Sequence, residues 1–594
     1  MKKILFILTI LLVLSIVITS CGFKKESPEA TPDSATTDST HECVLGDWTI
    51  VTHPTDKVDG LRERKCTECG KLLDSEAFKA SVGLKYSINE NTYTVTGLGD
   101  CRDTEVVIPS TYEGIPVTAI ANSAFRGCTT VVSVVIGENV NTIGDTSFYD
   151  CTSLKRVILP ASVTTVGNSA FYNCRLLDAV YFNGNVTDWL NIDFKNSYSN
   201  PTNNGTTLYV EGELVENLVI PEGIVDIKQY AFIGCESLKE LTMTESVKSI
   251  GQGAFERCKN LEKAEVGNNV KVLHDYAFYR CSSLKEITIG ENVVDLGQYC
   301  FSHCTSLVNV VIPDGVKTIK QYAFQYCSSL ESIEFGVQVT DVEKYAFYEC
   351  INLKEVTFND AMKTIGEGAF QNCWSLRKLT VNETFNSFGK YAFHQCYGLE
   401  QVHFNGTVDQ WAMLQFGNAD ANPFHLGAKF YVDGKLVTDL VIKEAEYIAF
   451  AAFYKCSSIS TVTIDGPVKY VGDYSFFQCP VLNKVTINST IESADCYIND
   501  WAFSGCPLLE TVTILNGVKT LHYTSFHDEA LLKEINLSTS VKELHDCCLC
   551  ANYALKVINY SGTVDEWNKV GKWNNWHHYY GGFTVICTDG VVQY

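Results

Sequence analysis

The amino-acid sequence predicts a β-rich repeat solenoid, a fold in which copies of one short unit stack along an axis. The first observation is a phenylalanine that recurs every 23 residues, at Phe255, Phe278 and Phe301, and a period of this size is the signature of a repeat architecture. The second is a cysteine three residues after each of these phenylalanines. The third is an apolar share of 46 %, which is enough for one continuous core.

The copy that begins at Val247 shows what each unit is expected to form. Leu261, Ala264 and Val266 have the spacing of a short strand, and Val247 and Ile250 form a second extended segment. The residues between the two segments suit a tight turn. One copy alone cannot bury its apolar face, so we expect the copies to stack about 4.7–4.9 Å apart and to share one core.

We call the recurring phenylalanine of each copy its pivot. Together with a degenerate last copy at Leu549, the pivots predict about 16 turns. The pivots are Phe125, Phe148, Phe171, Phe232, Phe255, Phe278, Phe301, Phe324, Phe347, Phe370, Phe393, Phe453, Phe476, Phe503 and Phe526.

The 25 cysteines suggest a disulfide framework at first. Fourteen of them, however, occupy the same place, three residues after a pivot. Free cysteine behaves as a small hydrophobic residue. The regular position of these cysteines in the repeat therefore favours a column of reduced, buried thiols over disulfides.

The N-terminus has the features of an export signal. Residues 1–20 are a signal peptide with a basic start and an apolar run, and the segment from Ile18 to Cys21 resembles a bacterial lipobox, which implies lipid attachment at Cys21. The alternative is an uncleaved membrane helix, for which the apolar run is slightly short. Residues 21–40 are rich in Ser, Thr, Pro and Asp and predict a flexible tether.

Residues 41–80 contain a small Cys/His module. His41 and Cys43 precede a C-x-x-C-G sequence whose cysteines are Cys66 and Cys69, and these four side chains suit a tetrahedral structural zinc ion. The segment resembles a small zinc-ribbon-like module of bacterial surface proteins. A disulfide and free thiols are the alternatives.

The remaining regions complete the predicted solenoid. Residues 81–120 alternate like β-strands and predict the N-terminal cap, and the repeats occupy residues 121–594. Two insertions, at about 182–218 and 404–440, share a Phe-Asn-Gly segment, a Trp and a Tyr-Val-x-Gly segment. We expect a short helix around each Trp, followed by a β-hairpin. A related unit at about 558–594 would form the C-terminal cap.

The whole unit, V-x-x-I-G-x-x-A-F-x-x-C-x-x-L-x-x-V-x-I-P, resembles the BspA-type (Treponema pallidum-type) leucine-rich repeat over about residues 115–594. The resemblance implies a right-handed, β-lined leucine-rich-repeat array on a bacterial cell surface. It implies roles in adhesion and protein binding, and it supplies no catalytic residues. No catalytic or phosphate-binding motif occurs in the sequence, so we expect a protein that is not an enzyme and that requires no cofactor.

Two surfaces are candidates for binding. The strand face carries mixed charges such as Glu262, Lys285 and Lys354, which could pair across turns or meet a polar partner. The other is a tyrosine column two residues before the pivots, which could be an exposed binding stripe or could stack to hold the turns together. Its members are Tyr230, Tyr276, Tyr299, Tyr322, Tyr345, Tyr391 and Tyr474.

The leading functional prediction is a lipid-anchored cell-surface binding protein or adhesin that presents its repeats to an extracellular protein or glycan. The alternatives are a structural surface spacer and a lipoprotein that captures glycans. A net charge of −23 argues against nucleic acid as a partner, because phosphates repel an acidic protein.

Overall fold

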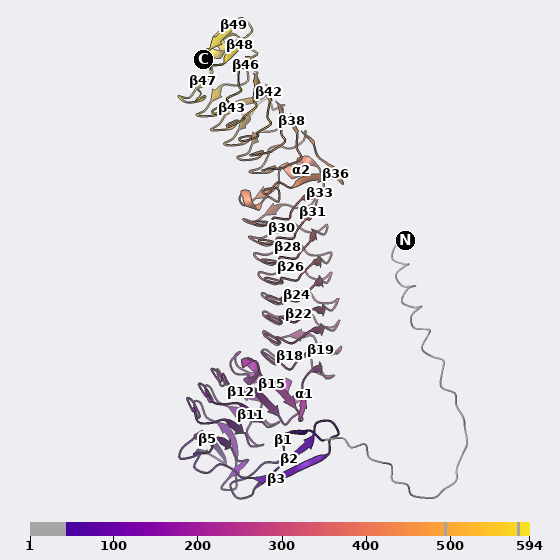
Figure 1. Cartoon of the computed structure of the whole chain (residues 1–594), viewed down its shortest axis with the longest axis vertical. Coiled ribbons are helices and arrows are strands. Elements are labelled where there is room, and N and C mark those ends of the chain that lie inside the picture. Colours follow the sequence, from indigo (N-terminus) through magenta and orange to yellow (C-terminus); the bar gives the residue numbers. More distant parts are fainter. Residues whose placement is uncertain (1–42, 492–495, 579–581) are drawn as a thin grey trace, which may run out of the picture. The chain divides into compact units, whose positions relative to one another are not determined.

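The computed structural model describes residues 43–491, 496–578 and 582–594 (Figure 1). Cys21 and His41, together with the predicted signal peptide and tether, lie outside the described residues. The chain divides into two compact units. The first comprises the residues up to Trp48 together with Arg64–Asp74, and the second comprises Thr49–Glu63 and Ser75–Tyr594.

The second unit is a β-solenoid in which each turn contributes one strand to a long-strand column (Figure 1). Most neighbouring strands pair in parallel with a register of 23 residues, as where Leu241 lies opposite Ala264, and the column divides into four sheets. The strands of this column are β6 (Glu105–Val107), β9 (Ser133–Val135), β11 (Arg156–Leu159), β13 (Ala179–Phe182), β15 (Thr207–Val210), β17 (Asn217–Val219), β19 (Glu240–Thr242), β21 (Lys263–Glu265), β23 (Glu286–Thr288), β25 (Asn309–Val311), β27 (Ser332–Glu334), β29 (Glu355–Thr357), β31 (Lys378–Asn382), β33 (Gln401–Asn405), β35 (Lys429–Val432), β37 (Asp439–Ile442), β38 (Thr461–Gly466), β40 (Lys484–Ser489), β42 (Thr511–Asn516), β44 (Glu534–Leu537), β46 (Val557–Tyr560) and β48 (Thr584–Cys587).

A second column of mostly two-residue strands runs along the other side of the core and also pairs in parallel, as where Ile250 lies opposite Leu273. Its strands are β8 (Ile115–Ile120), β10 (Thr142–Ile143), β12 (Thr165–Val166), β14 (Asp193–Phe194), β18 (Asp226–Ile227), β20 (Ser249–Ile250), β22 (Val272–Leu273), β24 (Asp295–Leu296), β26 (Thr318–Ile319), β28 (Asp341–Val342), β30 (Thr364–Ile365), β32 (Ser387–Phe388), β34 (Gln415–Phe416), β39 (Tyr470–Val471), β41 (Cys496–Ile498), β43 (Val518–Leu521), β45 (Glu543–Leu544) and β47 (Gly571–Lys572).

The pivots form the stacked centre of the core. Phe301 is fully buried, and its ring lies parallel to those of Phe278 and Phe324 at centroid distances of 5.6 and 5.2 Å. Each such ring buries about 150–250 Å². The pivot rings stack in three blocks, Phe125–Phe171, Phe232–Phe393 and Phe453–Phe526. The buried apolar side chains nevertheless belong to one cluster, so the predicted continuous core is confirmed.

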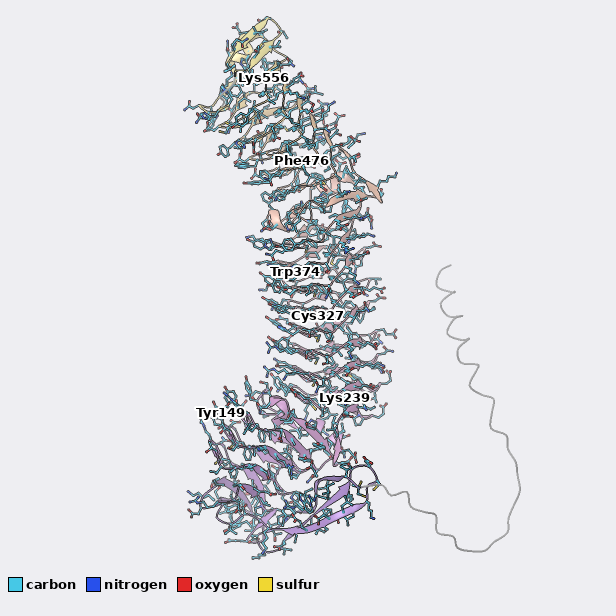
Figure 2. All side chains as sticks on the ribbon, viewed as in Figure 1. Tyr149, Lys239, Cys327, Trp374, Phe476 and Lys556 are labelled. Carbon is cyan, nitrogen blue, oxygen red and sulfur yellow. The ribbon has the colours of Figure 1, made fainter. Side chains whose placement is uncertain are left out.

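The prediction of buried free thiols is confirmed for thirteen of the fourteen column cysteines, and Cys128 is half-buried. Among the described residues every cysteine is a free thiol. The thiol of Cys327, labelled in Figure 2, donates a hydrogen bond to the backbone carbonyl of the preceding pivot, Phe301, at 3.2 Å. Ten other turns repeat this bond with distances between 3.1 and 3.3 Å. Burial raises the pKa of Cys396 to about 12, which keeps such thiols protonated and unreactive.

The N-terminal cap has the predicted β-structure. β4 (Lys85–Asn89) and β5 (Thr92–Gly97) form an antiparallel hairpin, and β5 then pairs in parallel with β8. β7 (Thr111–Tyr112) pairs antiparallel with β8. The hairpin thus covers the open end of the short-strand column, as a solenoid cap must.

The segment before the cap forms a three-stranded sheet of β1 (Leu45–Thr52), β2 (Gly60–Cys66) and β3 (Leu72–Phe78). Within the second unit, Ile50 and Phe78 from this sheet pack on the outward face of the first long strands. Val135 and Tyr181, which point outward there, are consequently only 1 % and 7 % exposed.

The two insertions are the predicted helix and hairpin units. The helices are α1 (Val186–Leu190) and α2 (Val408–Ala412), and α3 (Val564–Lys569) belongs to the C-terminal unit. The hairpins form where β16 (Glu213–Leu214), β36 (Lys435–Leu436) and β49 (Gly590–Gln593) pair antiparallel with the last long strand of each unit. Short 3-10 helices also occur at Pro201–Asn204 and Ala419–Ala421.

Each insertion contains an enlarged turn that keeps the sheet in register, because Ala179 lies opposite Thr207 and Gln401 lies opposite Lys429. These turns have no pivot of the repeated type. The described chain forms about 21 turns, more than the roughly 16 that the pivots predict.

The insertion tryptophans are structural. Trp189 and Trp411 are fully buried. The indole Nε1 of Trp189 donates to the backbone carbonyl of Ala231 at 2.8 Å, and that of Trp411 donates to Ala452 at 2.9 Å. Both carbonyls belong to the turn after the insertion, so the indole groups connect the enlarged turn to the next regular one.

One turn replaces the column cysteine with an acid. Glu529 lies three residues after the pivot Phe526 and is fully buried, and neither carboxyl oxygen has a hydrogen-bond partner among the described residues. Burial raises the pKa of the Glu529 carboxyl well above its ordinary value. A neutral carboxylic acid, like a thiol, carries a proton that can be donated, so we infer that Glu529 is protonated in the folded protein.

We expect the C-terminal turns to lose stability as the pH rises. The unfolded Glu529 releases its proton near its ordinary pKa, whereas the folded one retains it. The contribution of Glu529 to the free energy of unfolding is therefore complete below about pH 4.5 and decreases as the pH rises toward the raised pKa. Glu529→Gln should flatten this dependence between pH 5 and 8, measured by the thermal unfolding midpoint. The exposed neighbour provides the control, Asp528→Asn. Equal pH slopes for Glu529→Gln and the unmodified protein would contradict the assignment.

Candidate binding surface and metal site

The position of the tyrosine column is set by a backbone conformation that recurs in every copy. The residue two positions before each pivot has a left-handed conformation, with φ of 61° at Tyr276, 56° at Tyr299 and 61° at Tyr322. Gly253 and Gly368 occupy the same position in two turns, both with φ of 57°. The chain reverses direction here, so every turn presents the side chain of this residue at the same place.

Four of the predicted tyrosines form one continuous stack. The rings of Tyr276 and Tyr299 are 4.9 Å apart, those of Tyr299 and Tyr322 are 4.6 Å apart, and those of Tyr322 and Tyr345 are 5.6 Å apart. The planes of each pair lie within 12° of parallel. The stack ends at Gly368, where an added Cβ would lie 2.4 Å from the Tyr345 ring.

The other three members stand apart from this stack. Tyr230 lies next to Gly253, whose added Cβ would lie 3.0 Å from the tyrosine ring. Tyr391 is 40 % exposed and makes an edge contact with His394. Tyr474 lies parallel to Trp501 at 6.1 Å. The structure therefore brings together four of the seven predicted residues.

Stacking covers both faces of the Tyr299 and Tyr322 rings and one face of the Tyr276 and Tyr345 rings. The hydroxyl of Tyr345 donates to Glu367 at 3.1 Å. Within the described residues, the hydroxyls of Tyr276, Tyr299 and Tyr322 have no hydrogen-bond partner, although the rings are half-buried. A sugar ring that stacks on an aromatic side chain needs an open face. This geometry therefore favours a role in holding the turns together.

A shallow groove of about 700 Å³ runs beside this stack. Its lining is polar and includes Gln298 and Gln321, which precede Tyr299 and Tyr322 in the chain. The amide of Gln321 donates to the side-chain oxygen of Gln298 at 2.5 Å, and Thr364 donates to Asp341. Much of its polar lining is already paired across turns.

Two exposed aromatic residues lie on consecutive turns and were not part of the predicted stripe. Trp374 (labelled in Figure 2) is 47 % exposed and Tyr397 is 65 % exposed. Each lies four residues after its pivot, and the amide after Tyr397, that of Gly398, donates to the Trp374 carbonyl at 3.0 Å. Among the described residues neither ring contacts another aromatic ring. We call Trp374 and Tyr397 the exposed aromatic pair.

A signal for this pair was present in the sequence. The same position, four residues after the pivot, holds Ser282, Thr305, Ser328 and Ile351 in the four preceding turns. The change to two large aromatic side chains is visible when the copies are aligned on their pivots.

The charged strand face is paired across turns, as one interpretation of the sequence expected. Lys285 meets Glu262 at 2.7 Å, and Lys354 meets Glu331 at 2.5 Å. These side chains are about half exposed, so each pair contributes roughly 0–1 kcal/mol. A polar partner would have to displace these pairs, which makes the strand face the weaker candidate for binding.

The thiols of the Cys/His module converge within the first unit. The sulfur atoms of Cys43, Cys66 and Cys69 all lie within 4.8 Å of one another, and those of Cys43 and Cys69 are 3.8 Å apart. The turn is closed by the Gly70 amide, which donates to the Cys66 carbonyl at 3.0 Å, with Gly70 at φ of 69°. Desolvation and the hydrogen bonds to Cys69 and Cys66 raise the pKa of Cys43 to about 11.

This donor set fits a zinc ion. With Zn–S bonds of about 2.3 Å, a tetrahedral ion separates its sulfur ligands by about 3.8 Å, which is the distance between Cys43 and Cys69. A disulfide would use two of the three converging thiols and leave the third beside it. The fourth predicted ligand, His41, lies outside the described residues.

No helix of the described residues is long and apolar enough to cross a membrane.

The stacked parallel strands, the pivot column and the absence of a long helix from the described residues define a leucine-rich-repeat solenoid. Residues 99–207, 205–331, 318–430 and 439–570 match the family described as BspA type Leucine rich repeat region (6 copies). The chain belongs to this family, as its repeat unit predicts.

Solved structures of bacterial repeat proteins are similar to the chain. A leucine-rich repeat protein from Bacteroides ovatus is 23 % identical, with 73 % of this chain and 93 % of that chain covered and a TM-score of 0.42. A leucine rich cell surface protein from Faecalibacterium prausnitzii is 19 % identical, with 84 % and 98 % covered and a TM-score of 0.29. The leucine-rich repeat protein of T. pallidum is 27 % identical, with 38 % and 88 % covered and a TM-score of 0.25. A comparison with curated proteins finds no match.

Two substitutions of Tyr322 separate the roles of its ring and its hydroxyl. Tyr322→Phe should change the free energy of unfolding by less than about 0.5 kcal/mol, because the hydroxyl lacks a partner. Tyr322→Ser removes two stacked contacts and should lower it by about 1–3 kcal/mol. Ser123 and Ser169 adopt the same left-handed conformation, so the backbone tolerates serine. Chemical denaturation measures both changes, and equal stability of the two variants would refute the stacking role.

Proposed function

We propose that the chain is an exported, surface-displayed binding protein that holds an extracellular protein partner through the exposed aromatic pair. The family supports a repeat-based binding or surface role, and its solenoids are typically not enzymes. Attachment to the membrane through a lipid on Cys21 is part of this proposal and follows from the resemblance of its N-terminus to a lipobox.

The observation that carries the proposal is the exposure of Trp374 and Tyr397 at the same repeat position on consecutive turns. Exposed apolar side chains are common singly, but two large aromatic residues at one repeat position on adjacent turns are a local concentration of apolar surface. Tryptophan and tyrosine are enriched among the residues that dominate the energy of protein interfaces.

The surroundings of the pair suit a protein partner. Arg377 and Glu400 are exposed and follow Trp374 and Tyr397 by three residues on the same two turns. An aromatic centre with a charged, solvent-accessible rim is the usual composition of a protein interface. The groove beside the tyrosine stack has a polar lining that would suit a glycan instead, and a glycan is therefore an alternative outcome of the test.

We also propose that Cys43, Cys66 and Cys69, with His41 as the fourth ligand, hold a structural zinc ion. The support is the convergence of three thiols at a tetrahedral spacing. Four protein ligands leave no open position for a substrate. The ion would stabilise this end of the sheet, because it would join Cys43, which precedes β1, to Cys66 and Cys69 at the turn between β2 and β3.

The binding proposal is tested with residues 22–594 against immobilised extracellular-matrix proteins and mucins and a glycan array. We expect saturable binding to a protein, weakened at least about tenfold by Trp374→Ala with Tyr397→Ala, because aromatic hot spots contribute about 2 kcal/mol or more.

Tyr553→Ala is the matched control for this experiment. Tyr553 occupies the same repeat position in the last copy and is 63 % exposed, but the residue at that position one turn earlier is Ala530. Binding that survives the double substitution would refute the role of the pair. Binding to glycans alone would favour glycan capture, and no saturable binding would favour a structural spacer.

The zinc proposal is tested by elemental analysis of residues 22–594 purified under reducing conditions. Cys43→Ser with Cys69→Ser should remove about one equivalent of zinc from each chain, and His41→Ala should weaken zinc retention against a chelator. Cys128→Ser, in the repeat column, is the control. Unchanged zinc in the double variant would overturn the proposal, as would a disulfide within the three-cysteine cluster of the unreduced protein.

A further inference from the structure

The last, degenerate copy places two cysteines where earlier copies have aromatic side chains. Cys547 occupies the position of the tyrosine column, with φ of 54°, and Cys550 follows the pivot Leu549 directly. Side chains at these two positions contact each other in earlier copies. The rings of Tyr276 and Tyr279, for example, are 5.5 Å apart. The repeat geometry therefore brings the two thiols together.

The local contacts agree with this placement. The Cys550 amide donates to the Cys547 carbonyl at 3.2 Å, which closes the turn between them. Desolvation and a hydrogen bond with Cys547 raise the pKa of the Cys550 thiol to about 12. The sulfur of Cys550 also accepts a bond from the backbone amide of His578 at 3.0 Å.

Two histidines reach the same place from the turns on either side. His527 follows the pivot Phe526 directly, as Cys550 follows Leu549. His578 is on the following turn, which is aligned by the bond from the Leu549 amide to the Trp576 carbonyl at 3.1 Å. His527, Cys550 and His578 thus come from equivalent positions in three successive turns, and Cys547 lies three residues before Cys550.

The two cysteines and the two histidines line one cavity of about 410 Å³. His527 Nδ1 is buried, and it has no hydrogen-bond partner among the described residues. A buried ring nitrogen without a partner is uncommon, because an unmade bond is unfavourable. This nitrogen therefore has a free lone pair or proton, and its ring lines the same cavity as the two thiols.

We propose that Cys547, Cys550, His527 and His578 form a zinc site at the C-terminal end of the solenoid, separate from the N-terminal three-cysteine cluster. Two thiolates and two imidazoles are a frequent donor set for a tetrahedral structural zinc ion. The four ligand atoms do not meet the 4.8 Å mutual spacing found for the N-terminal cluster. Binding therefore requires the imidazole rings to rotate toward the thiols, so the ion itself completes the site.

The site would join the last three turns. A terminal turn has a neighbour on one side only, and the ligands come from three turns in succession. Zinc would thus strengthen the end of the array, where the pivot phenylalanine is replaced by Leu549 and the column cysteine by Asn552.

The test uses residues 22–594 with Cys43, Cys66 and Cys69 changed to serine, so that the N-terminal cluster cannot contribute. After chelation, Zn²⁺ and Co²⁺ are added alone. We expect about one bound equivalent, a tetrahedral cobalt spectrum with thiolate charge-transfer absorption, and a higher thermal unfolding midpoint with zinc. Cys547→Ser with Cys550→Ser should abolish all three, and His527→Ala with His578→Ala should abolish the tetrahedral spectrum.

Cys548→Ala is the matched control and should retain zinc. Cys548 lies in the same turn and is fully buried, but its thiol faces the Trp576 carbonyl at 3.6 Å and does not line the cavity. Circular dichroism confirms that each variant is folded. Fewer than about 0.2 equivalents of zinc in the folded parent would overturn the proposal. A disulfide between Cys547 and Cys550 in the unreduced protein would also overturn it.

Discussion

The hydrogen bond from a buried column thiol to the carbonyl of the preceding pivot, made by eleven of the fourteen column cysteines, is the interaction on which the stacking depends. The pivot carbonyl lies beside the phenylalanine column, where water cannot reach it, and a buried acceptor without a donor is unfavourable. Cysteine is small enough to fit one copy above the next and carries a proton to donate. Asn552 shows the same requirement, because its amide donates to the Phe526 carbonyl at 2.8 Å.

Much of the fold follows from the sequence because the repeat converts local pattern into tertiary structure. The position of Phe301 in its own copy predicts that it contacts Phe278 and Phe324, since each turn meets only its neighbours. Counting pivots does not detect the enlarged turns, because Trp189 and Trp411, rather than phenylalanine, fill the core there. The covered outward face at Tyr181 could not be predicted either, because the sheet that buries it belongs to a different part of the chain.

The candidate sites were less predictable than the fold. The sequence placed Tyr276, Tyr299, Tyr322 and Tyr345 in one column, but the choice between an open stripe and a closed stack depends on ring orientation, which a sequence does not specify. The same limit applies to Cys547 and Cys550, whose contact follows only from the observed pairing of their positions in other copies. Trp374 and Tyr397 differ from these groups because no other ring covers them within the described structure.

The reduced cysteine column has a consequence for where this protein can fold. A secreted chain rich in cysteine usually depends on an oxidant and a disulfide-exchange catalyst, and wrong pairings trap it. Here the thiols act as hydrogen-bond donors, so oxidation would remove the protons that the carbonyls need. The repeat array can therefore assemble without oxidative folding enzymes, and burial protects the column thiols once their neighbouring turns have closed.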